Sequence, residues 1–152
     1  MIGKLILTHG GLARELLSAA QTISGRLSSF EAVSLDWNDG PDEAKAQVRA
    51  AIRRLDQGEG VLILTDMYGG TPCNVASTFC QPGKVEVLTG VNLPMVLRLA
   101  CQSSEDGDLS TVAKGLLAKA HRSLCLVSDM VQPAKCVDES TVASVPAEKK
   151  HD

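Results

Sequence analysis

Short apolar runs alternate with helix-like patterns along most of this chain, and the alternation limits its fold more than any other feature. Runs with the length and aliphatic composition of buried strands cover residues 4–8, 30–35, 61–65 and 85–89, with a weaker candidate at 124–127. Helical patterns cover residues 12–24, 41–55, 74–80, 93–101 and 109–121. Strands that alternate with helices predict an α/β fold, an open and mostly parallel sheet with helices on both faces.

The two clearest helices are each predicted from one apolar face. Leu12, Leu16, Ala20 and Ile23 share a face in the first, which we expect to end before Gly25. In the second, which opens at Gly40-Pro41-Asp42, the apolar face consists of Ala44, Val48, Ala51, Ile52 and Leu55. These faces are expected to pack against the sheet.

Composition favours one globular domain and disfavours several classes of protein. The chain has 152 residues, 44% of them hydrophobic, and only one Trp, one Tyr and two Phe, so the core must be aliphatic. A net charge of −3 gives no basic field for nucleic acid. With neither a signal peptide pattern nor an apolar run of membrane-spanning length, we expect a cytoplasmic protein.

The cysteines indicate neither a disulfide framework nor a structural zinc site. There are five of them, an odd number, and none forms a C-x-x-C pair. We expect most of them to be buried thiols that act as small apolar residues.

Chemically capable residues follow three of the predicted strands. His9 follows the first strand, Asp66 and Gly69-Gly70-Thr71 follow the third, and Asn92 lies after the fourth. Ligands of parallel sheets bind beyond the carboxyl ends of the strands, so these residues are expected to share one edge.

His9 and Asp66 suit a nucleophilic histidine held by a carboxylate. A neutral imidazole is nucleophilic through one ring nitrogen when the other nitrogen donates its proton to an acceptor, and Asp66 is placed to be that acceptor. Phosphoryl oxygens would be held by backbone N–H groups, those of Gly10 and of the Gly69-Gly70-Thr71 loop. The Thr71 hydroxyl would add one more contact. The sequence has neither of the glycine-rich nucleotide-binding patterns.

Each of these residues also has a purely structural interpretation. His9 alone fits a loop or core histidine, Asp66 a turn cap, Gly69-Gly70 a tight turn, and Thr71 the N-cap before Pro72. His121 and His151 are expected to be solvated. Because His9, Asp66 and the glycine loop converge on one edge of the sheet, the functional interpretation is favoured.

Three segments resemble signatures of the mannose-type A domain (EIIA) of the sugar phosphotransferase system (PTS). They read LTHGGLARELL at 7–17, TDMYGGTPCNVA at 65–76 and TGVNLPM at 89–95. The resemblance implies a single PTS EIIA type-4 domain over 1–130 with strand order 2-1-3-4. Residues 131–152, with mixed polar residues, two prolines and a charged end, are interpreted as a flexible tail.

The family pattern implies a phosphotransferase that forms a covalent phosphohistidine. His9 would accept a phosphoryl group from the phosphocarrier protein HPr, through the ring nitrogen that points away from Asp66, and pass it to a histidine of an EIIB component. Asp66 would orient the ring, and Gly10, Gly69, Gly70 and Thr71 would contact the phosphoryl group. No metal, nucleotide or other cofactor is implied, and the membrane is reached only through EIIC and EIID.

The resemblance also implies a homodimer in which a fifth, antiparallel strand is exchanged, a role that 124–127 would fit. Two departures stand out: Cys73 replaces a usual Phe, and no fused B domain follows.

Two alternatives stay open, namely a regulatory module of the same fold that senses phosphorylation, and the phosphotransfer subunit of dihydroxyacetone kinase. The second is disfavoured by the Gly-Gly-Thr-Pro-x-Asn loop. The transported sugar is not encoded in this chain.

Overall fold

A four-stranded parallel sheet forms the centre of the protein, as the computed structural model of the chain shows for residues 1–36, 38–103 and 107–131. In chain order the elements are β1 (Gly3–His9), α1 (Leu12–Ser24), β2 (Phe30–Leu35), α2 (Pro41–Leu55), β3 (Val61–Thr65), α3 (Thr71–Ser77), β4 (Val85–Thr89), α4 (Leu93–Ala100), α5 (Leu109–His121) and α6 (Val127–Met130). The strand order β2-β1-β3-β4 confirms the predicted 2-1-3-4 order.

The register of the sheet brings the carboxyl ends of β1 and β3 together. Leu7 pairs with Thr65 in the parallel β1–β3 ladder, and His9 pairs with Leu35 in the β1–β2 ladder. The residues that follow β1 and β3 therefore leave the sheet side by side. Every residue of β3 is buried, which is typical of a central strand covered on both faces.

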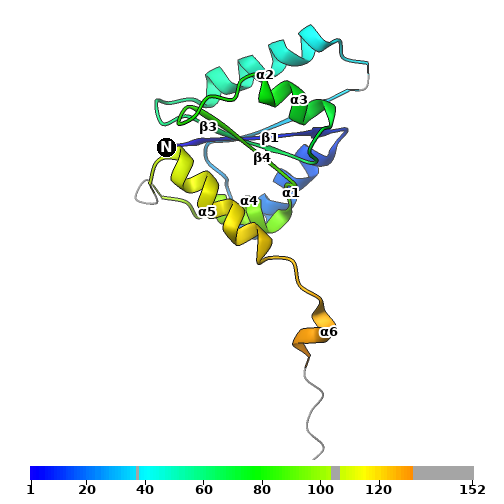
Figure 1. Ribbon diagram of the computed structural model, residues 1–152, viewed down its shortest axis with the longest axis vertical. Coiled ribbons are helices and arrows are strands. Elements are labelled where there is room, and N and C mark those ends of the chain that lie inside the picture. Colours follow the sequence, from blue (N-terminus) through cyan, green and yellow to red (C-terminus); the bar gives the residue numbers. More distant parts are fainter. Residues whose placement is uncertain (37, 104–106, 132–152) are drawn as a thin grey trace, which may run out of the picture.

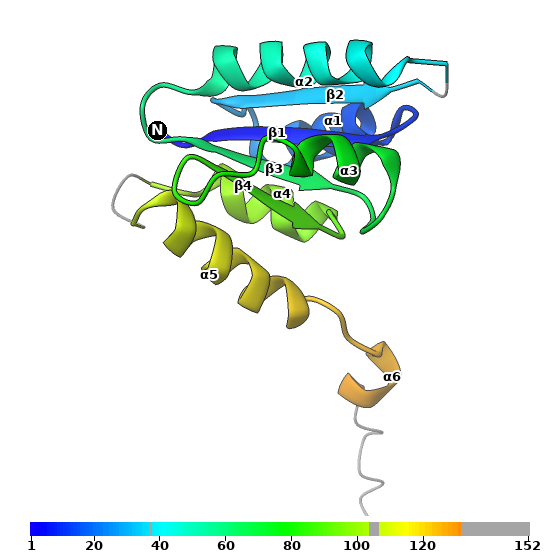
Figure 2. The ribbon, with the colours of Figure 1, turned by 45° about the horizontal axis from the view of Figure 1, so that its top comes forward.

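Helices cover both faces of the sheet, as predicted (Figure 1). α2 and α3 lie on one face, whereas α1, α4 and α5 lie on the other, an arrangement that is also visible after rotation in Figure 2. Two aliphatic clusters fill the interfaces, one for each face. Complete burial of each Leu, Ile or Val side chain contributes roughly 1.5–3 kcal/mol.

The direction of the side chains alternates along β1 and determines where its last residues point. Leu5 and Leu7 face the α2 and α3 side, and Ile6 faces the α1 side. Because successive residues of a strand point to opposite faces, Thr8 lies toward α1 and His9 toward α3.

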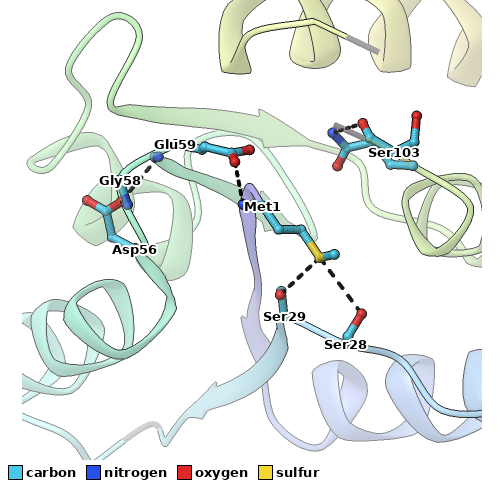
Figure 3. A network of polar contacts seen from close by, with 9 residues as sticks. Met1, Ser28, Ser29, Asp56, Gly58, Glu59 and Ser103 are labelled. Atoms are coloured by element: carbon cyan, nitrogen blue, oxygen red, sulfur yellow. Dashed lines mark hydrogen bonds and ion pairs between the residues drawn. The ribbon is translucent and has the colours of Figure 1, made fainter. Parts of the chain in front are cut away.

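A polar network lies at the opposite, amino end of the sheet (Figure 3). The Met1 ammonium is 2.6 Å from a Glu59 carboxylate oxygen, and the Ser29 hydroxyl donates to the Met1 sulfur at 3.2 Å. Asp56 accepts bonds from the amides of Gly58 and Gly60 through Oδ1. These contacts hold the turn that leads into β3.

Two expectations about burial are wrong. The buried face of α1 is centred on Ala13 and Ala20, whereas Leu12 and Ile23 at the helix ends are exposed. The apolar face of a helix continues beyond the turns that pack on the sheet. Apolar residues in the first and last turns of the helix are therefore left exposed. Among the described cysteines, Cys73 is buried but Cys80, Cys101 and Cys125 are exposed; Cys136 lies outside the described residues.

The predicted fifth strand is absent from the single chain. Residues 124–126 have no regular structure, and Val127 begins the short helix α6, which stands away from the body (Figures 1 and 2). A strand needs a neighbour for its backbone groups, and the segment has none among the residues that the structure describes. The predicted tail, apart from Val131, lies outside the described residues. None of the helices in the described part of the chain has both the length and the apolarity to cross a membrane.

Candidate functional site

His9 and Asp66 meet at the carboxyl edge of the sheet. His9 ends β1, and Asp66 comes directly after β3, the neighbouring strand. The His9 ring nitrogen Nδ1 lies 2.7 Å from Asp66 Oδ2, and the His9 backbone N–H donates to the same oxygen at 3.0 Å. The side chains are 25% and 14% exposed respectively, so the pair is reachable from solvent but largely enclosed.

The hydrogen bond with Asp66 assigns the protonation of the neutral ring. A carboxylate can only accept hydrogen bonds, so Nδ1 carries the proton and donates it. The second ring nitrogen, Nε2, then holds the lone pair. This is the tautomer that a nucleophilic imidazole requires.

The pKa of Asp66 lies below its ordinary value as the net result of opposing influences. Burial acts to raise the pKa, but the bonds from the His9 backbone and ring, the charge of a protonated His9, and the Met67 amide together lower it. The Met67 N–H donates to Asp66 Oδ1 at 2.9 Å. The carboxylate is thus ionised at neutral pH and available to hold a proton on Nδ1.

Gly70 lies against the His9 ring. A Cβ atom added at Gly70 would be 2.7 Å from His9 Cε1, closer than Cβ atoms approach other atoms in real proteins, and 3.3 Å from Nε2, a tight contact. The backbone there has φ −75° and ψ 164°, which any residue can adopt. A side chain at this position is therefore disfavoured by the His9 ring and not by the backbone conformation.

Gly70→Ala is expected to displace the His9 ring. If His9 accepts a phosphoryl group, as the resemblance implies, this substitution should slow the uptake about tenfold, since small displacements of a reacting group are costly. Stopped-time labelling with a phosphorylated donor would measure the rate. Gly40→Ala is the matched control, because Gly40 is also an extended N-cap glycine near a proline but has open space around its Cβ position. Equal rates for the two variants would show that the contact with His9 is unimportant.

Thr8 supports the loop after β1, a role that the sequence analysis missed. Its Oγ1 accepts a bond from the Ala13 N–H at 2.8 Å and donates to the His9 carbonyl at 3.2 Å. The hydroxyl therefore takes the place of an N-cap for α1, whose actual N-cap is Gly11. The signal in the sequence is a threonine at the end of a strand, one residue before the Gly10-Gly11 pair that leads into a helix.

The remaining predicted site residues lie in the same two loops. Gly10 and Gly69 both have positive φ, and Gly69 accepts a bond from the Asn74 side chain. Thr71 is exposed and is the first residue of α3, so its interpretation as the N-cap is wrong: Gly70 is the N-cap. Asn92, by contrast, caps α4 through a bond from the Met95 N–H at 3.1 Å.

Two surface hollows differ in whether they border the loop after His9 at the carboxyl edge of the sheet. A small one of about 180 Å³ borders the loop after His9 and is lined by Gly10, Gly11, Arg14, Ser34, Leu35 and Asp36. A larger one of about 980 Å³ runs between α4 and α5, on apolar residues such as Met95 and Leu116. The larger hollow is lined by neither His9 nor Asp66, so its volume does not mark this candidate site.

Comparison with known proteins identifies one family. The sequence profile of the family EIIA-man, described as "PTS system fructose IIA component", matches residues 3–116. The chain is 26% identical to the PTS system fructose-specific EIIA component of Bacillus subtilis over 142 residues, which cover 93% of this chain and 97% of that protein.

Further relatives agree with this match. The chain is 30% identical over 106 residues to the PTS system mannose-specific EIIAB component of Escherichia coli; the match covers 69% of this chain and 33% of that protein. Among solved structures, the mannose/sorbose-specific IIA subunit from Enterococcus faecalis is similar, with a TM-score of 0.71 and 31% identity over 83% of this chain and 95% of that one.

Proposed function

The chain belongs to the EIIA-man family of phosphotransferase-system components, and from this premise we propose that it carries a phosphoryl group on His9. The donor would be the phosphocarrier protein HPr, and the acceptor a histidine of an EIIB component. The observation that supports this role best is the 2.7 Å contact of His9 Nδ1 with the ionised Asp66.

The proposed step is a displacement between two imidazoles. The Nε2 lone pair of His9 forms a new bond to phosphorus while the N–P bond of the donor histidine breaks, and the donor ring takes back the electron pair. Nδ1 keeps its proton, so His9 becomes a phosphoimidazolium whose positive charge the Asp66 carboxylate stabilises. Passing the group on to EIIB reverses these roles.

Backbone groups of the two glycine loops would hold the phosphoryl oxygens in this proposal. Phosphoryl transfer requires mainly positioning and charge neutralisation. Gly10 follows His9 directly, and Gly70 lies against its ring. With Gly69 and Thr71 they would supply N–H donors and one hydroxyl, since the first N–H groups of a helix have no partner inside it.

The proposal is tested by incubating the protein with phosphorylated HPr and locating the phosphate by mass spectrometry. A single acid-labile phosphoryl group on the peptide that contains His9 is the expected result. No uptake, or uptake on another residue, would refute the proposal. Added EIIB is expected to remove the label quickly, whereas a label that persists with every EIIB partner would favour a regulatory module.

The same proposal places the protein in the cytoplasm. HPr and EIIB would be its direct partners, and the membrane would be reached only through the EIIC and EIID components. Residues 1–130 would form the phosphotransfer domain. The membrane components would determine which sugar is transported. The names of similar proteins include fructose-specific and mannose-specific systems.

We further propose that the protein forms a homodimer, in which the second copy covers the segment after α5. Large apolar side chains are exposed there, with Leu124 77% and Met130 69% exposed. Several exposed apolar side chains in one short segment favour an interaction site, and a strand at 124–127 would find its neighbour on a second copy. Sedimentation equilibrium is expected to give twice the 16.0 kDa mass of one chain. A monomer at micromolar concentration would contradict the dimer without affecting the proposal for His9.

A further inference from the structure

Two consecutive glycines bring the loop between β3 and α3 against the reactive ring. Gly69 has a φ of +79°, a left-handed conformation that glycine adopts far more readily than other residues. Gly70 follows, and a Cβ atom built there would lie 2.7 Å from His9 Cε1 and 3.3 Å from Nε2. The conformation of this glycine pair therefore determines how the loop borders the His9 ring.

The same two glycines also make the loop hard to hold in one conformation. Glycine has more backbone freedom to lose on folding than any other residue, and here two follow each other. Gly70 is the N-cap of α3 but has no side chain with which to cap the helix. On the β3 side the loop is bonded through the Met67 N–H, which donates to Asp66 Oδ1. A restraint on the glycines themselves has to come from the α3 side.

Asn74 supplies that restraint from within α3. Its side-chain Nδ2 donates to the Gly69 carbonyl at 3.3 Å, and its backbone N–H donates to the Gly70 carbonyl at 2.9 Å. The backbone bond has the ordinary spacing of an α-helix, whereas the side-chain bond reaches back past the N-cap. One residue thus holds the carbonyl groups of both glycines.

The packing of α3 fixes the position from which Asn74 acts. Its sequence neighbours Cys73 and Val75 are both buried, and Ala76 is fully buried. Val75 and Ala76 belong to the apolar cluster that also contains residues of β1 and β3. The side chain of Asn74 is exposed and takes no part in this cluster. The amide is therefore carried by a helix turn that is anchored to the sheet, and it ties the glycine loop to that turn.

We propose that Asn74 is a positioning residue for phosphoryl transfer, because it holds the glycine pair so that Gly70 stays against the His9 ring. This rests on the proposed function of His9. Asp66 fixes the ring at Nδ1, and Gly70 limits movement of the Cε1 edge, so Nε2 keeps one direction for attack on phosphorus. Asn74 acts through Gly70 and not on the phosphoryl group itself.

Proton NMR of the unphosphorylated protein tests whether Asn74 acts on the ring. Gly70 lies against Cε1, so the Cε1–H signal of His9, identified by its loss in His9→Gln, reports on the glycine pair. Asn74→Ala is expected to shift this signal. Ser77→Ala is the matched control and is expected to leave it unchanged, because the Ser77 hydroxyl donates to a carbonyl of the same helix, that of Cys73, at 2.8 Å. An unchanged signal in Asn74→Ala would overturn the positioning role.

Single-turnover labelling with two donors measures the effect on transfer. Phosphorylated HPr binds through a protein surface, whereas phosphoramidate is a small P–N donor that needs none. Asn74→Ala is expected to lower the rate at saturating phosphorylated HPr about tenfold, with KM changed less than about twofold, and to lower the phosphoramidate rate by a similar factor. Ser77→Ala is expected to keep both rates. A loss with phosphorylated HPr alone would mean that Asn74 contacts the donor protein, and would overturn the proposal.

Asn74→Asp provides a second variant of nearly the same size. Its carboxylate can only accept hydrogen bonds, so it cannot donate to the Gly69 carbonyl and is expected to slow labelling at least as much as Asn74→Ala. Wild-type rates in either folded variant would refute the positioning role alone. If neither donor labels His9 in the wild-type protein, the proposed function fails, and the part of Asn74 in transfer fails with it even where the NMR signal has shifted.

Discussion

Replacing His9 with glutamine is expected to abolish phosphoryl uptake altogether. Glutamine resembles histidine in size and can still donate a hydrogen bond to Asp66, but an amide nitrogen has no available lone pair for attack on phosphorus. The side chain lies at the end of β1 and is partly exposed, so we expect the fold to be retained. Labelling with phosphorylated HPr and with phosphoramidate, read by mass spectrometry, measures the loss.

His121→Gln is the matched control for this variant. His121 lies at the exposed end of α5, and its replacement is expected to leave labelling unchanged. Circular dichroism and thermal unfolding would verify that His9→Gln is folded. Acid-labile phosphate on a folded His9→Gln protein would remove His9 from the relay.

Asp66→Asn is expected to slow phosphorylation by about ten- to ten-thousandfold, the upper end being the scale of losing a carboxylate that orients a catalytic histidine. Asparagine is nearly isosteric and can accept the His9 backbone bond. However, it has no charge to stabilise the phosphoimidazolium, and its amide can also donate to Nδ1 and so favour the wrong tautomer. Single-turnover labelling under excess donor gives the rate directly.

Asp56→Asn provides the matched control for charge. Asp56 also accepts two backbone amides, yet it lies at the amino end of the sheet (Figure 3). Its substitution is expected to leave the phosphorylation rate unchanged. A rate for Asp66→Asn equal to that of Asp56→Asn would mean that Asp66 holds the loop but takes no part in transfer.

The lowered pKa of Asp66 also gives this residue an acid-dependent part in stability. A carboxyl whose pKa is lower in the folded than in the unfolded state stabilises the fold fully above the unfolded value, ordinarily 3.8. The stabilisation is lost as the pH falls through the folded value. The difference in unfolding free energy between wild type and Asp66→Asn is therefore expected to shrink in acid, as urea titrations at several pH values would show.

The strands were predictable because each carries its own local signal. A central parallel strand is buried on both faces, so a run such as Val61–Thr65 is apolar throughout and its bounds appear in the sequence. The alternation with helices then predicted a parallel sheet. The segment at 124–127 shows the limit of this reasoning, because strand formation depends on a neighbouring strand, and the described part of the chain supplies none for it.

Part of the candidate site was predictable, and the rest depends on distances between atoms far apart in sequence. The rule that ligands bind at carboxyl ends of parallel strands places His9 and Asp66, 57 residues apart, at one edge. The approach of Gly70 to the His9 ring has no local signature, since its backbone conformation is ordinary. Exposure of Tyr68 and of three cysteines likewise depends on which surfaces the helices cover.

The two bonds from His9 to one oxygen of Asp66 have a kinetic consequence. Because the backbone amide and the ring nitrogen are held by the same Oδ2, the imidazole is fixed relative to its own main chain and cannot swing between two positions. In the proposed relay, the donor and the acceptor would therefore approach Nε2 from the same direction and occupy the same space in turn. The relay would run as a ping-pong cycle in which each protein partner, at high concentration, obstructs the other.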